Sequence, residues 1–266
     1  MTRRKLLFLS LLAAVPVACL STVAGCRSAG PCGWIAAGGD FWWPAAYVPP
    51  LVVGVASVLV WALRLGLIAS SASVELGTLR RIPVSLELVR GTRAAGIDRI
   101  VCVEGESPVA FCAGFVRPTV FISEGALAEL SESELLAVLH HEADHARRRE
   151  PLRRAASVAA AEALSFLPIV RWWTDRQLTR TELRADIAAE QMVGRPALAG
   201  ALLVMTAPAT SLAAFAGHTE LRARRLLGLG IDEPKPPRTA WAATLVYSWL
   251  ALSLAGCLFE VVVALF

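Results

Sequence analysis

Long uncharged stretches are the feature that most restricts how this chain can fold. Leu6 to Gly25 carries no charge and follows three basic residues, and Tyr47 to about Ala69 carries one charged residue, Arg64, near its far end. A third uncharged run extends from Thr239 to Phe259. Each run is long enough to cross a bilayer, where the backbone must be hydrogen-bonded within its own segment. Each therefore predicts a transmembrane helix.

The composition agrees with a membrane protein and disfavours several other classes. Hydrophobic residues make up 56% of the chain and the mean hydropathy is +0.56, which is high for a soluble protein. The net charge of +4 comes from basic residues that are spread without interleaved aromatic residues, so no nucleic-acid partner is expected. The six cysteines form no C-x-x-C pair, which argues against a zinc ribbon or a disulfide scaffold.

The distribution of basic residues predicts the orientation. The loop between the first two runs carries Arg27 and Asp40, whereas the second run is followed by Arg80, Arg81, Arg90, Arg93 and Arg99. Because basic loops stay in the cytoplasm, the region after the second run is expected there. We predict two transmembrane helices with a short external loop in residues 1–70, a cytoplasmic-facing domain in 71–238 and a C-terminal transmembrane helix in 239–266, in the inner membrane of a bacterium.

The N-terminal run has an alternative interpretation. Val23 to Cys26 resembles the cleavage site of a bacterial lipoprotein signal, which would leave Cys26 as a lipidated N-terminus. Alternatively, Cys26 and Cys32 lie in an external loop in which a disulfide can form. Either alternative leaves the predicted orientation of the downstream chain unchanged.

The charged central region predicts short strands first. Ile82 to Val89 and Ile100 to Val103 have strand composition, and Val109 to Ser123 predicts a strand pair that turns near Val116 to Pro118. These segments predict a small sheet.

Two helices are predicted after the strands. Ser131 or Ser133 can cap the first, whose apolar face contains Leu135, Leu136 and Leu139. The second is predicted from Thr174, as its cap, to Val193, with Gly194 as its stop.

The first of these helices carries a metal-binding motif. His141-Glu142-Ala143-Asp144-His145 is H-E-x-x-H, and a spacing of four residues places both imidazoles on one helix face, one turn apart. Such a pair can bind one zinc ion, with Glu142 beside it as the base that takes a proton from a water molecule. His140 and Asp144 form a separate pair on a rotated face, interpreted as supporting or packing residues.

A catalytic zinc site needs a third protein ligand. Glu182 and Asp186 share a face of the second helix, which fits a ligating carboxylate followed one turn later by a carboxylate that accepts the free N–H of a ligating histidine. The alternative is that both are solvated charges that pair with Arg180 or Arg184. The upstream H-E-x-x-H motif favours the first interpretation.

Two further apolar stretches interrupt the central region. Ala155 to Val170 is short and contains Glu162, and Pro196 to Gly217 has Pro208 near its middle, so neither predicts a clean membrane span. A single crossing by the first stretch would also separate the histidine pair from Glu182. We therefore expect that stretch to pack within the domain or to enter the membrane and return.

Three segments resemble the integral-membrane gluzincin peptidases: Ser107 to Gly114, Pro118 to Leu127 and Glu134 to Glu142. These peptidases include the bacterial M56 group of antibiotic sensors and the related M48 group. Leu167 to Trp173 is more similar to M56 than to M48. The resemblance covers about residues 71–230 and implies an α+β fold, with a mostly helical, membrane-embedded zincin-like domain, a small β-sheet and transmembrane helices.

The resemblance also implies roles for individual residues. His141, His145 and Glu182 would bind Zn²⁺, Glu142 would be the catalytic base, and Asp186 would support a ligand. His218 and Arg222 are candidates to stabilise the transition state, and the sequence leaves the choice between Arg222 and Arg225 open.

The chain departs from the resembling proteins in two places. It ends at Phe266, without the extracellular penicillin-binding domain of the M56 sensors, so β-lactam sensing is not expected. Family members often have aspartate where this chain has Glu150.

The expected function is that of a membrane-bound zinc-dependent metalloendopeptidase acting in regulatory proteolysis. Its partners would be the lipid bilayer and a protein or peptide substrate, such as a transcriptional repressor or a membrane protein. The substrate is expected to add as a strand along Thr119 to Ser123, unless that segment is an ordinary core strand. The alternative function is a catalytically silent membrane scaffold or sensor with a gluzincin-like fold.

Overall fold

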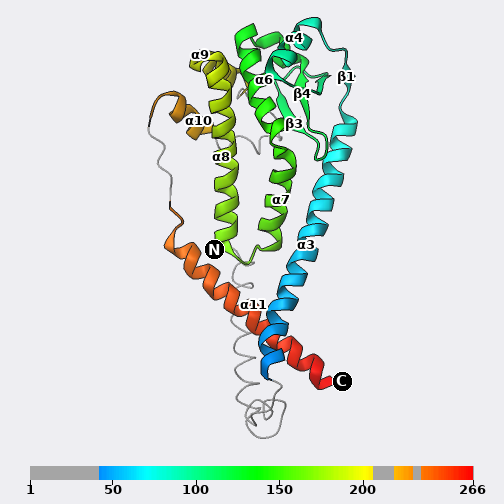
Figure 1. Ribbon diagram of the computed structural model, residues 1–266, viewed down its shortest axis with the longest axis vertical. Coiled ribbons are helices and arrows are strands. Elements are labelled where there is room, and N and C mark those ends of the chain that lie inside the picture. Colours follow the sequence, from blue (N-terminus) through cyan, green and yellow to red (C-terminus); the bar gives the residue numbers. More distant parts are fainter. Residues whose placement is uncertain (1–41, 206–218, 230–234, 266) are drawn as a thin grey trace. The chain divides into compact units, whose positions relative to one another are not determined.

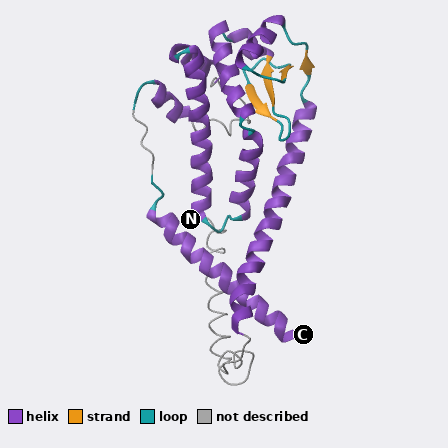
Figure 2. Cartoon of the chain, in the orientation of Figure 1, coloured by secondary structure: helices purple, strands orange, loops and turns teal. Residues whose placement is uncertain are grey.

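The computed structural model describes residues 42–205, 219–229 and 235–265 (Figure 1). This part of the chain is mostly helical and contains one four-stranded sheet (Figure 2), which confirms the α+β class. The predicted span from Leu6 to Gly25, the lipoprotein-like site at Cys26, the Cys26–Cys32 disulfide and His218 lie outside the described residues.

The chain divides into two compact units. One contains residues 62–162 and 170–235, which include the sheet and the helices around it. The other contains α3 up to Trp61, the short connection Ala163–Ile169 and helix α11 (Arg238–Leu265). All the predicted site residues that the structure describes belong to the first unit.

Helix α3 (Trp42–Thr78) includes the second apolar run and continues beyond it. Its portion Pro50–Thr78 is, among the described residues, the one helix long and apolar enough to cross a membrane. Several large apolar side chains along it are exposed, including those of Leu51, Val58, Leu59 and Leu63. These exposed apolar side chains fit a segment that lies in a bilayer.

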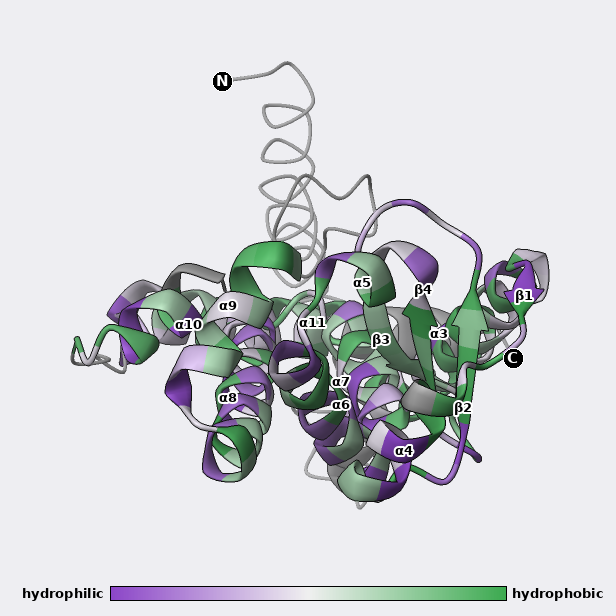
Figure 3. Cartoon of the chain, turned by 90° about the horizontal axis from the view of Figure 1, so that it is seen from above, coloured by the Kyte–Doolittle hydropathy of each residue, from purple (hydrophilic) through white to green (hydrophobic). Residues whose placement is uncertain are grey.

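The sheet has the order β1-β2-β4-β3. Its strands are β1 (Arg81–Ile82), β2 (Ile100–Val103), β3 (Ala110–Ala113) and β4 (Thr119–Ser123). β2 and β4 are parallel, and the other two pairs are antiparallel. Figure 3 shows β2, coloured as hydrophobic, beside β4. The predicted β2 strand and the predicted strand pair are both confirmed.

The prediction of a strand from Ile82 to Val89 is wrong beyond Ile82. The chain instead forms helix α4 (Leu86–Ala95). Ser85 caps this helix by accepting the backbone N–H of Leu88 at 3.2 Å. Leu88, Thr92 and Ala95 are buried, and this spacing of four and three residues forms one helix face. That face packs against α6, so the apolar residues belong to a helical pattern.

The prediction that a substrate adds along Thr119 to Ser123 is also wrong, because β4 has a strand on each side. Its backbone groups already pair with β2 and β3. The alternative interpretation as a core strand is confirmed, since Val120 and Ile122 are fully buried. Among the described strands, β3 is the edge strand that packs against the helix carrying the H-E-x-x-H motif.

Helix α6 (Glu132–Arg147) lies at the centre of this unit and packs against β3, β4, α4 and α9 (Arg195–Met205). It follows the short helix α5 (Glu124–Glu129) and begins with a capping box, in which Glu134 accepts the backbone N–H of Ser131 at 2.9 Å. At Gly200 of α9, a Cβ atom would lie 2.0 Å from the Glu134 carboxylate, so a larger residue there would require the Glu134 side chain to move. The second interior apolar stretch thus begins as a helix packed against α6.

Helices α7 (Glu150–Ala163) and α8 (Pro168–Val193) are joined by a short turn (Figure 1). The first interior apolar stretch therefore turns back on itself. Thr174 is not a cap as predicted: α8 already begins at Pro168, a residue suited to a first helical turn, and Thr174 is buried inside the helix. Gly194 ends the helix as predicted, with φ of 85°.

Candidate metal centre

The two motif histidines lie on adjacent turns of α6 and face each other. Their Nε2 atoms are 3.1 Å apart, and both side chains are buried. The surrounding helix is packed on several sides, which leaves little freedom for either ring. The motif residues therefore have the arrangement that their spacing predicted.

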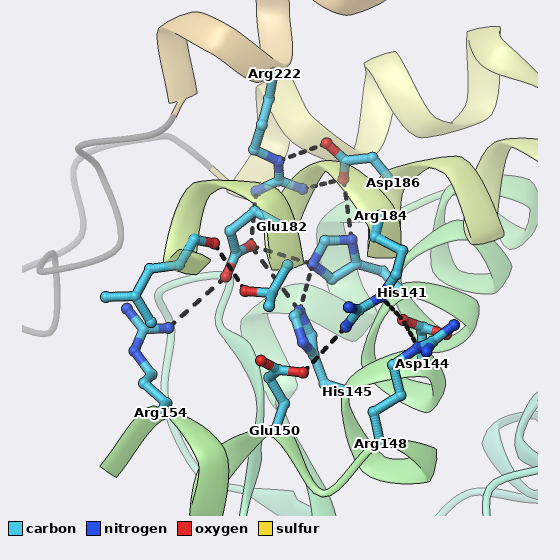
Figure 4. A network of polar contacts seen from close by, with 12 residues as sticks. His141, Asp144, His145, Arg148, Glu150, Arg154, Glu182, Arg184, Asp186 and Arg222 are labelled. Atoms are coloured by element: carbon cyan, nitrogen blue, oxygen red, sulfur yellow. Dashed lines mark hydrogen bonds and ion pairs between the residues drawn. The ribbon is translucent and has the colours of Figure 1, made fainter. Parts of the chain in front are cut away.

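Glu182 approaches the same point from α8. Its Oε2 atom lies 3.5 Å from His141 Nε2 and 3.9 Å from His145 Nε2. The ligand atoms of His141, His145 and Glu182 all lie within 4.8 Å of one another, and all three residues are buried (Figure 4). The structure thus brings the predicted third ligand to the histidine pair.

These three donors fit a metal ion. Tetrahedral zinc with bonds of about 2.0–2.1 Å holds two ligand atoms about 3.3 Å apart, close to the shorter separations observed here. When both rings carry their proton on Nδ1, the two Nε2 lone pairs face each other and repel, and the buried carboxylate beside them adds negative charge. A cation between the three atoms removes both costs.

Asp186 lies beside one of the histidines. Its Oδ1 atom is 3.0 Å from His141 Nδ1, a distance at which a carboxylate can keep the ring proton on Nδ1 and leave Nε2 free to bind a metal. Burial raises the pKa of the Asp186 carboxyl, but contacts with His141 and Arg222 outweigh it and hold the pKa below its usual range. Asp186 therefore stays ionised, as this role requires.

Arg222 on helix α10 (Thr219–Leu226) binds Asp186 with two hydrogen bonds, 2.9 Å from Nε and 2.7 Å from Nη2. Its Nη1 atom lies 3.9 Å from Glu182 Oε2. Arg225 instead pairs with Glu190, farther along α8. Of the two arginines that the sequence left open, Arg222 is therefore the one at the site, and it connects both carboxylates of α8.

Glu142 is buried beside the histidines. Burial is the main cause that raises the pKa of its carboxyl to about 7, while His141 opposes the shift and the carboxylate of Glu182 adds to it. The backbone N–H of Cys112 on β3 donates a hydrogen bond to it. Glu142 is thus held between α6 and the sheet edge, with a pKa suited to accepting and releasing a proton near neutral pH.

Two further arginines lie close to these residues, of which only Arg184 was considered from the sequence. Arg154 of α7 has its Nη1 atom 3.7 Å from Glu182 Oε1. Arg184 donates from Nε to Asp144 at 3.3 Å and from Nη2 to Glu150 at 3.0 Å (Figure 4). The sequence offered Arg184 as a partner for Glu182 or Asp186, whereas it connects α8 to the end of α6 and the start of α7.

Replacing Arg184 by Gln is expected to lower the free energy of unfolding by about 1–2 kcal/mol, because buried Glu150 then loses a charged hydrogen bond. Denaturant unfolding of the full chain measures this change. Arg171→Gln, an exposed change on the same helix, is the control and should have little effect. The double variant Glu150→Gln/Arg184→Gln should lose less than the sum of the two single changes; strict additivity would contradict the contact.

Comparison with known proteins gives one positive finding. Residues 84–216 match peptidase family M48, a range that begins just before α4 and includes H-E-x-x-H, Glu182 and Asp186. Among curated proteins, no significant match to the chain is found. The matched range is half of the chain and contains the converging group His141, His145 and Glu182, so the chain belongs to peptidase family M48 and is a metallopeptidase.

Proposed function

We propose that this metallopeptidase is a membrane-bound, zinc-dependent endopeptidase that acts in regulatory proteolysis. The observation that carries the proposal is the convergence of His141, His145 and Glu182 from two helices, with the buried carboxylate of Glu142 beside them. Two imidazoles and one carboxylate are the ligand set of many catalytic zinc sites, which keep a position open for water or substrate. When bound, zinc supplies the Lewis acidity that activates a water molecule and polarises the peptide carbonyl.

Glu142 is the proposed proton carrier. Its carboxyl accepts a proton from the attacking water and passes it to the nitrogen of the leaving amine. A pKa of about 7 allows it to hold and to release that proton at neutral pH. The hydrogen bond from the Cys112 N–H fixes the direction in which the carboxyl points.

Asp186 and Arg222 are proposed to fix the metal ligands. Asp186 holds the ring of His141, and the two hydrogen bonds from Arg222 hold Asp186 in turn. Nη1 of Arg222 points toward Glu182 and remains a candidate donor to the transition state. His218 is the second candidate donor, on its sequence position alone.

The edge strand β3 is the proposed place where the substrate backbone binds. β3 pairs with β4 on one side and is the last strand of the described sheet. Its residue Cys112 contacts Glu142, so a peptide lying along this edge would pass beside the proposed base. An extended peptide adds to an exposed strand through main-chain hydrogen bonds, which suits an endopeptidase that accepts many side chains.

The membrane assignment rests on helix Pro50–Thr78 and its exposed apolar side chains. We propose that residues 1–70 and 239–266 anchor the chain in a bacterial inner membrane as a multi-pass protein, with the peptidase domain 71–238 on the cytoplasmic side. The charge asymmetry around the second apolar run supports this orientation. Within the gluzincins, the segment Leu167 to Trp173 supports a relation to the M56 group, and a repressor or a membrane protein is the proposed substrate.

The test uses the purified full chain in detergent micelles. We expect about one zinc per chain by metal analysis. Hydrolysis of casein should stop on treatment with a zinc chelator and return when zinc, but not magnesium, is added. His145→Ala should lose both the zinc and the activity. Chelator-resistant hydrolysis would contradict the proposal, and a zinc-loaded chain without hydrolysis would favour the silent scaffold.

A further inference from the structure

A cavity lies on a different face of α6 from His141 and His145. Its volume is about 370 Å³, and its walls come from the end of α4, from α6 and from the second half of α8. The polar side chains that line it are those of Arg93, His140, Arg147 and Gln191. No acidic side chain of the described residues lines it, so the cavity is basic.

His140 is the buried polar group of this cavity. Its side chain is 7% exposed, and neither ring nitrogen has a hydrogen-bond partner within the described parts of the chain. The ring N–H of His140 is therefore available to a ligand in the cavity that offers an acceptor oxygen. His140 precedes the metal ligand His141 by one residue, which rotates its ring by about 100° away from the metal.

The two arginines add positive charge that the neighbouring carboxylates do not neutralise. Arg147 lies 3.8 Å from Asp144, but the same carboxylate also binds Arg148 and Arg184. Three arginines therefore share Asp144 and the nearby Glu150. For Arg93, the described residues offer no ion pair. The dipole of α4 places roughly half a negative charge at its C-terminal end, and the two positive charges of Arg93 and Arg147 exceed it.

We propose that this cavity binds a phosphate group, either free or esterified in a lipid headgroup. Two guanidinium groups and a neutral imidazole N–H match the acceptor oxygens of a phosphate. A water molecule takes up about 30 Å³, so a phosphate ion, which is only a few times larger, fills part of the cavity and leaves room beside it. The apolar wall formed by Ala94, Ala95 and Met192 can accept a small organic group attached to the phosphate.

The experiment measures phosphate binding to the zinc-loaded full chain in detergent micelles by titration calorimetry, at constant ionic strength. The wild type should show saturable binding. Arg147→Gln should weaken it about tenfold, and Arg93→Gln/Arg147→Gln should abolish it, because each arginine supplies a charged hydrogen bond. The matched control Arg90→Gln/Arg153→Gln removes two charges from exposed positions of α4 and α7 and should leave binding within about twofold of the wild type.

Two results would overturn the proposal. One is an equal loss of binding in the control pair, which would indicate general charge attraction. The other is loss of phosphate binding when zinc is removed, which would place the anion on the metal. The two sources of phosphate are separated by repeating the titration in phosphatidylcholine bilayers with and without phosphatidylglycerol. If phosphate binds more weakly in the bilayers that contain phosphatidylglycerol, the lipid headgroup is the ligand. If binding is the same in both bilayers, the ligand is free phosphate.

Discussion

Replacing Glu142 by Gln is expected to leave zinc bound and to lower kcat for peptide hydrolysis by about a hundredfold to ten-thousandfold. Glutamine keeps the shape of the side chain and can still accept the N–H of Cys112, but it cannot take a proton from water. The amide is also neutral, so it adds no unpaired charge to a buried position. The chain should therefore remain folded while the chemical step is lost.

The measurement compares zinc content, the midpoint of unfolding and casein hydrolysis in the variant and the wild type. Glu132→Gln is the matched control, because Glu132 is an exposed glutamate in the first turn of the same helix. It should keep all three properties. Wild-type turnover in Glu142→Gln would show that another group carries the proton, and zinc loss would show that Glu142 is a ligand.

Local sequence patterns predicted the part of the site that lies on one helix. The spacing of His141 and His145 places them on one face of any α-helix. Ser131 and Ser133 were the predicted alternatives for the cap of that helix, and the structure has Ser131, paired with Glu134. The predicted pairing of Glu182 with this motif needed an additional chemical argument, namely that two imidazoles do not complete a zinc site. The structure brings the three residues together.

Features that depend on contacts between distant segments could not be read from the sequence. The order of the four short strands put β4 inside the sheet and left β3 at its edge, and no pattern within Thr119 to Ser123 indicates this. The apolar residues after Ile82 fit a strand as well as a helix until their packing against α6 is known. Arg184 and Asp144 are likewise distant in sequence, and nothing local marks them as partners.

The charges around Glu182 explain why this residue is expected to contribute more to zinc affinity than a residue that only supports a ligand. Its carboxylate lies within 3.7 Å of Arg154 and 3.9 Å of Arg222, in addition to the two histidines. Burial raises the pKa of Glu182, but His141, His145 and Arg222 outweigh it and hold the pKa well below its usual range. Glu182 is thus a buried negative charge that lies beside the two histidines and two arginines, Arg154 and Arg222.

Replacing Glu182 by Ala is therefore expected to reduce zinc affinity by more than about a hundredfold, beyond the tenfold to hundredfold typical of residues that only support a ligand. Asp186→Ala should reduce zinc affinity by about tenfold to a hundredfold. The Glu182→Ala change removes one of three proposed metal ligands and leaves Arg154 and Arg222 to repel the cation.

Competition with a zinc-binding dye measures the zinc affinity of each variant. Glu190→Gln is the control, because Glu190 lies on the same helix and pairs with Arg195 and Arg225 away from the metal ligands. Normal zinc affinity and hydrolysis in Glu182→Ala would mean that the third ligand comes from another residue.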